Sequence, residues 1–576
     1  MPVTELPQGR YLTCVFQAAP HAGGQTRALL MRNRIFAREG MRPDVLTLGA
    51  TNDHDERREI MLERGLLVEG IGWRNIYEHY LEHGWGDRPG TGEPLADLGP
   101  HRTNERFRPD GSPWRITYKV PGAHLPIYDY LRRDGTPYLR IPAFGLTRGG
   151  RGRDTIRQVG PDGHVVGQFA SAAEWFRRWI RELTEGDERA FVFIDSRHVV
   201  PHVVPMRIKR IHLIYVMHNI HVQPPFRWDS ETNKAYRRVL RRIGGLDAMV
   251  TLTERQREDI AQRRGRTSNL FVVPNPVEMP AAPAGAARDP DRVAIVARLE
   301  GQKRLEEAIA AFERVTQKVP SARLDIFGEG GQRERLQAAI DGAGLAGNVN
   351  LRGFHSEARD ALWTASAFML TSAFEGHPLS ILESMSRGCP VVSYDIKYGP
   401  REQITDGVDG FLVPAGDRAA LARGVVELLR SPELVERMSA AARERASRFG
   451  PQEFVAAWAA VLRTAVEQRG KRTQITDVRL DLERLRRLRW GRLQLAGTLQ
   501  VELRRPRTLK AAEVQLSAID AATGAVTELP LKVERQDGRL RIRTPGVLGP
   551  RLPDGALLRL RCTWRNSAWE TELTTP

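Results

Sequence analysis

The sequence predicts an α/β protein with two doubly wound, Rossmann-like domains that face a cleft, an inserted antiparallel β region and a C-terminal β-sandwich-like domain. Three observations lead to this prediction. Short apolar runs alternate with amphipathic stretches in two separate parts of the chain, as in parallel sheets covered by helices on both faces. A Pro/Ala-rich linker separates these parts. Two other segments have the strand-and-turn texture of antiparallel sheets.

The first Rossmann-like domain is expected over residues 1–70 and 170–280. The apolar run YLTCVFQ (11–17) ends at a Pro-His-Ala-Gly-Gly loop, and an amphipathic stretch and the run VLTLG (45–49) follow. Strand, glycine loop, helix and strand form the opening of a doubly wound domain. Further buried strands are predicted at 191–195, 212–217 and 248–252.

Residues 71–169 interrupt this pattern and predict a β-rich insertion. The segment is rich in Gly, Pro, Arg and Tyr, and short alternating pieces such as WRITYKV (114–120) recur in it. Asp-Gly pairs punctuate these pieces at intervals typical of hairpins.

The second Rossmann-like domain is expected over residues 281–470, after the linker. Six apolar runs separated by helical patterns predict its strands: 293–299, 324–328, 349–353, 367–371, 390–395 and 410–414. Two helices at about 432–448 and 452–468 are expected to close this half. A basic linker helix is predicted at 471–489, and a small β domain at 490–576.

The bulk composition is that of a globular protein with an unusual charge. Its 87 Lys and Arg exceed its 70 Asp and Glu, for a net charge of +17, and residues 471–576 hold about half of the excess. Such a surface suits nucleic acid, anionic lipid headgroups or a polyanionic substrate, or it is the solvated surface of an Arg-rich protein. The sequence has no secretory signal pattern and no run of 18 apolar residues. Its three cysteines match no metal or disulfide spacing, so a reduced cytoplasmic compartment is expected.

The segment Phe374–Glu383 carries the strongest chemical signal. It follows a predicted strand, and Pro378 is suited to the first turn of a helix, so the N–H groups of Leu379 and Ser380 would point into the cleft as an anion site. Glu375 lies before this helix and Glu383 about a turn inside it. The alternative is an ordinary capped helix with a Glu that offsets the helix dipole.

Arg298 and Lys303 bracket the turn after the first strand of the second domain. Ligands of open α/β sheets bind at the carboxyl ends of strands, where two cations can neutralise a diphosphate leaving group. The alternative is a pair of solvated surface bases. An Asp-x-Asp motif, Asp289-Pro290-Asp291, falls in the linker and is interpreted as linker rather than as a metal site, so no metal is expected.

With these motifs in place, residues 10–465 resemble glycosyltransferase family 4, whose fold is GT-B. Within it they are similar to the poly(glycerol-phosphate) and poly(ribitol-phosphate) α-glycosyltransferases of wall teichoic acid. The resemblance rests on the cation pair, the two Glu residues and five further segments: Gly23–Thr26, Met217–His221, Val250–Thr253, Val273–Val277 and Ser393–Pro400.

The resemblance implies roles for these residues. Arg298 and Lys303 would hold the donor diphosphate, Glu375 would face the transferred sugar and Glu383 the ribose. His218 would lie near the sugar, with His221 as a rival. The remaining donor-binding residues would be Gly23, Gly24, Gly353, Phe354, His355, Leu379 and Ser380, with the three at 353–355 near the base. Configuration would be retained, and no cofactor is expected beyond a UDP-sugar as co-substrate.

The predicted function is therefore transfer of a hexose or N-acetylhexosamine from a UDP-sugar to a polyol-phosphate polymer. The alternative within the enzyme class is a family-4 transferase acting on a lipid-linked or capsular saccharide. The resemblance also implies a homo-oligomer through the β insertion, and the charge suggests peripheral contact with the inner membrane leaflet. A nucleic-acid-binding protein is disfavoured because aromatic residues are only 7% and no known module is present. A non-catalytic scaffold is disfavoured because all four charged donor-site residues are present.

Overall fold

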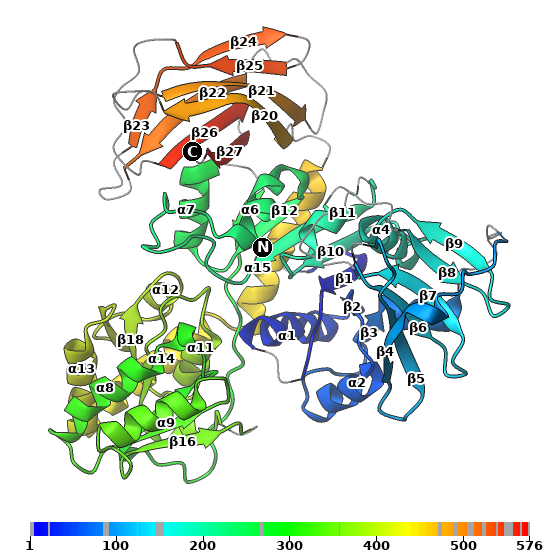
Figure 1. Ribbon diagram of the computed structural model, residues 1–576. Helices are drawn as coiled ribbons and strands as arrows, with labels where there is room; N and C mark the ends of the chain where they lie inside the picture. The colour runs from blue at the N-terminus through cyan, green and yellow to red at the C-terminus, as the bar shows by residue number, and fades with distance from the viewer. Residues whose placement is uncertain are drawn as a thin grey trace.

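The structure is a computed structural model. It describes residues 5–20, 23–84, 92–123, 125–143, 155–204, 206, 208–264, 269–355, 358–469, 475–487, 493–503, 512–520, 526–536, 539–545, 557–564 and 567–573. Figure 1 shows two α/β domains beside each other, an antiparallel sheet attached to the first, and a β-sandwich at the C-terminal end.

The first domain is built on a parallel sheet in the order β13-β12-β11-β10-β1-β2-β3. Its central strands are almost completely buried because helices cover both faces. The strands are β1 (Arg10–Val15), β2 (Pro43–Thr47), β3 (Gly72–Asn75), β10 (Ala190–Ile194), β11 (Ile211–Met217), β12 (Ala248–Thr251) and β13 (Leu270–Val272). Its helices are α1 (Gly24–Arg38), α2 (His54–Glu63), α3 (Ile76–His83), α4 (Ala172–Leu183), α5 (Val200–Val203), α6 (Lys234–Arg241), η2 (Ile243–Gly245) and α7 (Glu254–Arg264).

The inserted sheet is antiparallel, in the order β4-β5-β6-β7-β8-β9. It begins later than residue 71, because β3 pairs in parallel with β2 and completes the Rossmann-like sheet. Aromatic residues of the insertion share one core with Trp175 and Trp179 of α4. Its elements are η1 (Gly99–His101), β4 (Arg102–Phe107), β5 (Pro113–Tyr118), β6 (Ile127–Leu131), β7 (Pro137–Pro142), β8 (Ile156–Val159) and β9 (Val165–Phe169).

The second domain has a six-stranded parallel sheet in the order β16-β15-β14-β17-β18-β19, the strand order of a Rossmann fold. All six strands fall on predicted apolar runs. They are β14 (Asp289–Val296), β15 (Arg323–Phe327), β16 (Val349–Gly353), β17 (Ala365–Leu370), β18 (Val391–Asp395) and β19 (Gly410–Pro414). The helices are η3 (Gly301–Lys303), α8 (Leu305–Thr316), α9 (Arg333–Gly342), α10 (Ala361–Thr364), α11 (Leu379–Ser386), α12 (Pro400–Gln403), α13 (Arg418–Arg430) and α14 (Pro432–Ser447).

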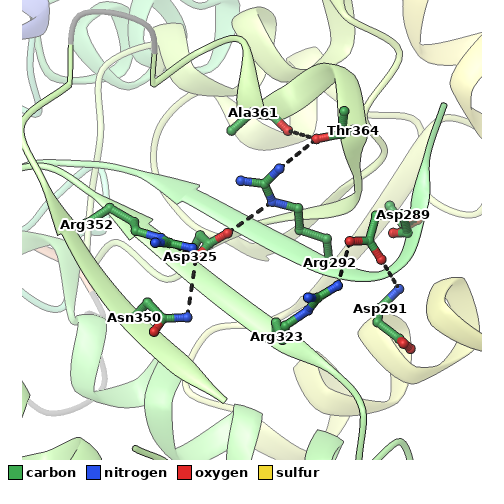
Figure 2. A network of polar contacts seen from close by, with 10 residues as sticks. Asp289, Asp291, Arg292, Arg323, Asp325, Asn350, Arg352, Ala361 and Thr364 are labelled. Carbon is green, nitrogen blue, oxygen red and sulfur yellow. Dashed lines mark hydrogen bonds and ion pairs between the residues drawn. The ribbon is translucent and has the colours of Figure 1, made fainter. Parts of the chain in front are cut away.

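Ion pairs join neighbouring strands of the second sheet (Figure 2). Asp325 of β15 is buried and binds Arg292 of β14 at 3.0 Å and Arg352 of β16 at 2.7 Å. Asp289 pairs with Arg323 at 2.7 Å. The interpretation of Asp289-Pro290-Asp291 as linker is therefore wrong: these residues begin β14, at the end of the sheet away from the carboxyl edge, and the Asp289 carboxylate is used between strands.

The last long helix, α15 (Pro451–Gln468), returns to the first domain instead of closing the second. Its Trp458 ring lies 5.2 Å from Phe193 of β10 and 6.2 Å from Phe36 of α1. The expected boundary at residue 470 is therefore wrong, because the apolar face of this helix fills the core of the first sheet. The helical pattern predicts an apolar face for α15, but it does not predict which of the two sheets this face packs against.

The C-terminal domain is a β-sandwich of two four-stranded antiparallel sheets. The basic helix predicted at 471–489 is wrong in its described part, since β20 (Ile475–Arg487) pairs along its length with β21. Leu482 and Leu485 are three residues apart, as on a helix face, whereas Leu480 and Leu482 alternate as in a strand. A bulge after Leu482 returns Leu485 to the core side. Residues 471–474 and 488–489 lie outside the described residues. The other strands are β21 (Leu493–Leu503), β22 (Ala512–Ile519), β23 (Val526–Leu529), β24 (Lys532–Gln536), β25 (Arg539–Arg543), β26 (Leu557–Trp564) and β27 (Ser567–Leu573).

The sandwich docks on the first domain beside α6 and α7 (Figure 1). Buried Arg559 of β26 donates to the carbonyl of Asp229 at 2.9 Å, and its guanidinium lies 5.6 Å from the centre of the Trp228 ring. Arg263 of α7 binds the same loop, donating to the carbonyl of Trp228 at 3.1 Å. No helix in the described part of the chain has the length and apolar character needed to cross a bilayer.

Replacing Arg559 by Ala is expected to loosen this docking. The substitution leaves a buried carbonyl without its charged donor, which costs about 1–3 kcal/mol. Amide hydrogen exchange of residues 226–232 should accelerate, and the melting temperature should fall. Arg543→Ala is the control, because Arg543 pairs with Glu534 at 2.7 Å in an exposed ion pair of little worth. Equal protection of residues 226–232 in Arg559→Ala and the wild type would contradict the docking role.

Candidate functional site

The strand orders of the two Rossmann-like sheets place their switch points at β1/β10 and at β14/β17. Ligands of such sheets bind outside the carboxyl ends of the strands at these points. The segments that follow β10, β11, β14 and β17 meet at the interface of the two domains. A small pocket of the second domain, at the ends of β14 and β17, is lined by Lys303, Ser372 and Ser380.

Lys303 and Glu375 form the centre of the second domain's share of the site. Lys303 Nζ lies 2.6 Å from Glu375 Oε1, and Ser372 Oγ donates to the same oxygen at 2.7 Å. The backbone holds this arrangement, since Ala373 N donates to the carbonyl of Gln302 at 2.8 Å. Lys303 and Glu375, which the sequence analysis assigned to the site separately, thus form one ion pair. Ser372 carried no signal in the sequence.

Arg298 follows β14 and is exposed at the domain interface. Among the described residues it has no carboxylate partner. Its side chain lies against Gly23, where an alanine Cβ would come within 3.2 Å of the Arg298 Nε. Gly24, the first residue of α1, borders open space, so the structure supports a close approach at Gly23 and not at Gly24.

The helix α11 begins at Leu379, with Pro378 as its N-cap rather than in its first turn. Within the described chain no side-chain oxygen caps this end. The first N–H groups of the helix, including those of Leu379 and Ser380, are therefore available to an anion.

Glu383 is buried in α11 and forms an ion pair with Arg27 of α1 across the interface. Arg359 lies 3.5 Å from the same oxygen, Oε1. Burial and the nearby Arg359 lower the pKa of Arg27 to about 9. Both arginines were missed from the sequence. The Arg-rich character of the first helix pointed only to Arg27, and nothing pointed to Arg359. The other oxygen, Oε2, is buried without a hydrogen bond from the described residues and can accept one from a ligand hydroxyl.

His218 follows β11, and its Nε2 lies 2.6 Å from Asp195 Oδ1. Asp195 follows β10 and binds Arg32 of α1 through both oxygens, at 3.0 and 2.6 Å. The rival His221 is fully buried, its ring parallel to that of Tyr398 at 6.2 Å. Of the two histidines, His218 is therefore the one near the switch point. Asp195 and Arg32 were not identified from the sequence.

Gly376 brings the two halves of the site together. An alanine Cβ there would lie 2.1 Å from the carbonyl oxygen of His218, so only glycine allows this backbone contact between the domains. The motif containing Gly376 was recognised in the sequence, but the reason for its glycine was not.

The three residues expected near the base lie at the end of β16. Gly353 has a φ of +75°. The Phe354 ring is 53% exposed and lies 5.5 Å from the guanidinium of Arg64, which ends α2 of the first domain. His355 packs edge-on against Phe327 at 6.4 Å. These three residues lie beside the domain interface. They follow the edge strand β16, whereas Lys303 follows β14, two strands away in the sheet.

His377 is buried and does not face the pocket. Its ring lies 5.5 Å from Phe449, and Gln403 Nε2 is 3.4 Å from its Nδ1. Burial lowers the pKa of His377 to about 3. The described residues contain no group of three or more His, Cys, Asp or Glu side chains arranged to hold a metal ion.

Comparison with known proteins gives one domain match and several relatives. Residues 282–445 match the family described as glycosyl transferases group 1. The poly(glycerol-phosphate) alpha-glucosyltransferase of Bacillus subtilis (strain 168) is 29% identical over 304 residues, which are 52% of this chain and 44% of that protein. The poly(ribitol-phosphate) alpha-N-acetylglucosaminyltransferase of Staphylococcus aureus (strain COL) is 27% identical, over 39% of this chain and 45% of that protein. The matched part thus spans less than half the length of either relative.

Solved structures support the fold. A crystal structure of TarM superposes with a TM-score of 0.62 at 18% identity, covering 79% of this chain and 99% of that one. A mutant of S. aureus TarM, crystallised in complex with fondaparinux, alpha-GlcNAc-glycerol and UDP, superposes with a TM-score of 0.61 at the same 18% identity. The predicted GT-B fold is confirmed.

Replacing Gly376 by Ala is expected to separate the domains locally. The added methyl group meets a backbone carbonyl that cannot rotate away, so the melting temperature should fall by several degrees. Gly24→Ala is the control, because no atom lies within 4 Å of its added Cβ and alanine favours a helix. The two melting temperatures check this, and equal values in the two variants would show that the contact is not tight.

His377 is expected to make stability depend on pH. The unfolded state binds a proton near pH 6.5, whereas the buried ring does so at about 3, so the stability of the folded state is full above pH 6.5. As the pH is lowered between these two values, the free energy of unfolding should fall by about 1.4 kcal/mol for each pH unit. His377→Gln should flatten this part of the curve in urea unfolding between pH 7.5 and 5. Parallel curves for the two proteins would contradict it.

Proposed function

We propose that this chain, which has the GT-B fold and carries a glycosyl transferases group 1 domain at residues 282–445, is a retaining, UDP-sugar-dependent hexosyltransferase. It would transfer a hexose or N-acetylhexosamine to a polyol-phosphate polymer of the teichoic-acid type. The observation that carries the proposal is that Arg298 and Lys303 follow β14 and the uncapped start of α11 follows β17, the two strands at the switch point of the second sheet.

The donor would bind with its diphosphate between these groups. Among the described residues Arg298 has no carboxylate partner, and Lys303 pairs with no carboxylate other than that of Glu375. Two cations and a helix N-terminus stabilise the negative charge that develops on the departing nucleotide. Glu375, held by Lys303 and Ser372, would face the sugar, and the free oxygen of Glu383 would accept from the ribose.

Retention of configuration follows from the family resemblance. The acceptor hydroxyl would attack from the face that the diphosphate leaves, and a leaving phosphate oxygen would take its proton. The UDP-sugar would be the co-substrate, and no cofactor is invoked.

The net charge of +17 supports a polyanionic acceptor, because a basic surface attracts and retains a phosphate polymer. The names of the two relatives support this acceptor class. We further propose that the protein acts in the cytoplasm at the inner membrane leaflet, and that it forms a homo-oligomer through the inserted sheet.

Removing either donor-site cation is expected to abolish most of the activity. Arg298→Ala and Lys303→Ala should each lower kcat by at least about 100-fold, since one lost charge-stabilising group typically costs several kcal/mol in the transition state. Lys318→Ala, on the exposed surface of the second domain, is the control. Initial rates with a radiolabelled UDP-sugar measure the effect, and a near-normal rate for Arg298→Ala would remove the diphosphate assignment.

The acceptor class is tested by salt. Transfer to poly(glycerol phosphate) or poly(ribitol phosphate) should weaken strongly between about 50 and 200 mM salt, as expected for multivalent phosphate contacts, while donor hydrolysis should change little. Transfer to a neutral capsular or lipid-linked saccharide, with no response to salt, would favour the alternative acceptor.

A further inference from the structure

A buried chain of three side chains runs from α1 to the site. Arg32, Asp195 and His218 come from α1 and from the ends of β10 and β11, and they are linked by contacts of 2.6–3.0 Å. The side chains of Arg32 and Asp195 are 3% and 0% exposed, and that of His218 is 9% exposed. A charged pair this deep beside a ligand-binding edge is costly unless each group is satisfied.

Asp195 is an acceptor for both neighbours. Burial by itself raises the pKa of Asp195, but Arg32 and the hydrogen bond with His218 outweigh it and hold this pKa below its usual range. An ionised carboxylate has no proton to donate, so His218 must donate from Nε2. Thr13 Oγ1 also accepts from Arg32, at 3.1 Å, which fixes the guanidinium in turn.

The carboxylates of Asp195 and Glu375 are each already paired with a cation. Arg32 neutralises Asp195, and Lys303 neutralises Glu375 in the facing domain. The Nδ1 of His218 has no hydrogen-bond partner among the described residues and is left as an acceptor.

We propose that Arg32 and Asp195 are positioning residues that hold His218 as the Nε2–H tautomer, so that Nδ1 accepts a hydrogen bond from one hydroxyl of the transferred sugar. This inference rests on the proposed function. It adds a selection rule: the donor sugar must offer an O–H at that position, and a group that only accepts hydrogen bonds is rejected.

The tautomer is tested first, independently of activity. Protein labelled with ¹⁵N in histidine gives long-range ¹H–¹⁵N spectra in which the two ring nitrogens differ, and the His218 signals are those lost in His218→Gln. At pH 7.5 the wild type should show a protonated Nε2 and an unprotonated Nδ1. An Nδ1–H tautomer or an imidazolium would overturn the proposal.

Asp195→Asn should reverse the tautomer. Arg32 only donates, so the amide oxygen turns toward it and the amide N–H faces Nε2, which leaves the proton on Nδ1. Asp129→Asn is the matched control, because Asp129 forms an equally buried two-bond pair with Arg140, at 2.6 and 2.6 Å, inside the inserted sheet. The control should lose stability and keep the wild-type His218 signals. An unchanged tautomer in Asp195→Asn would overturn the proposal.

The hydroxyl contact is tested with UDP-sugars in which fluorine replaces each hydroxyl in turn, because fluorine cannot donate. For the wild type and Asp129→Asn, kcat/KM should fall about tenfold or more at one position of the sugar. In Asp195→Asn the unmodified donor should lose activity, and the extra penalty at that position should disappear. The same penalty in all three proteins would overturn the role of Asp195. If the wild type turns over no UDP-sugar, the proposed function fails, while the spectra still decide the tautomer.

Discussion

The contact between the backbones of Gly376 and His218 sets the geometry on which the rest of the site depends. It places the loop that carries Glu375 directly against the end of β11, with no side chain between them. The Lys303–Glu375 pair of one domain and the Asp195–His218 pair of the other are therefore held at a fixed offset. A site divided between two sheets needs such a close backbone contact, because neither sheet alone determines the distance between their edges.

Polar contacts between the two domains reinforce the backbone contact of Gly376 and His218. Asp259 of α7 accepts from Lys397 and from the hydroxyl of Tyr398, each at 2.6 Å. Glu402 of α12 accepts from the backbone N–H groups of Glu254 and Arg255, and so caps the helix α7 of the other domain. Since α7 also binds the loop on which the β-sandwich rests, the sandwich and the second domain both hold this one helix.

Much of this architecture was predictable because buried parallel strands are continuous apolar runs, and each strand of the second sheet coincides with one. The position of Arg298, Lys303 and Glu375 at strand ends followed from the same pattern. The partners of Glu383 and His218 did not, since Arg27, Arg32 and Asp195 are brought there by tertiary packing from distant positions. The strand β20 was mistaken for a helix because the spacing of Leu482 and Leu485 is helical. The bulge that allows this spacing within a strand was not predictable from the sequence. The destination of α15 depends on packing between domains, which local periodicity does not encode.

The chain crosses between the two domains twice, once after β13 and once between α14 and α15. These crossings are not independent, because the N–H of Val277 on the first donates to the carbonyl of Phe449 on the second at 2.8 Å. Asn275 adds a bond to the carbonyl of His377 at 2.9 Å. The two connections therefore form one hydrogen-bonded link between the domains. Such a link resists twisting of one domain against the other more strongly than two independent segments would.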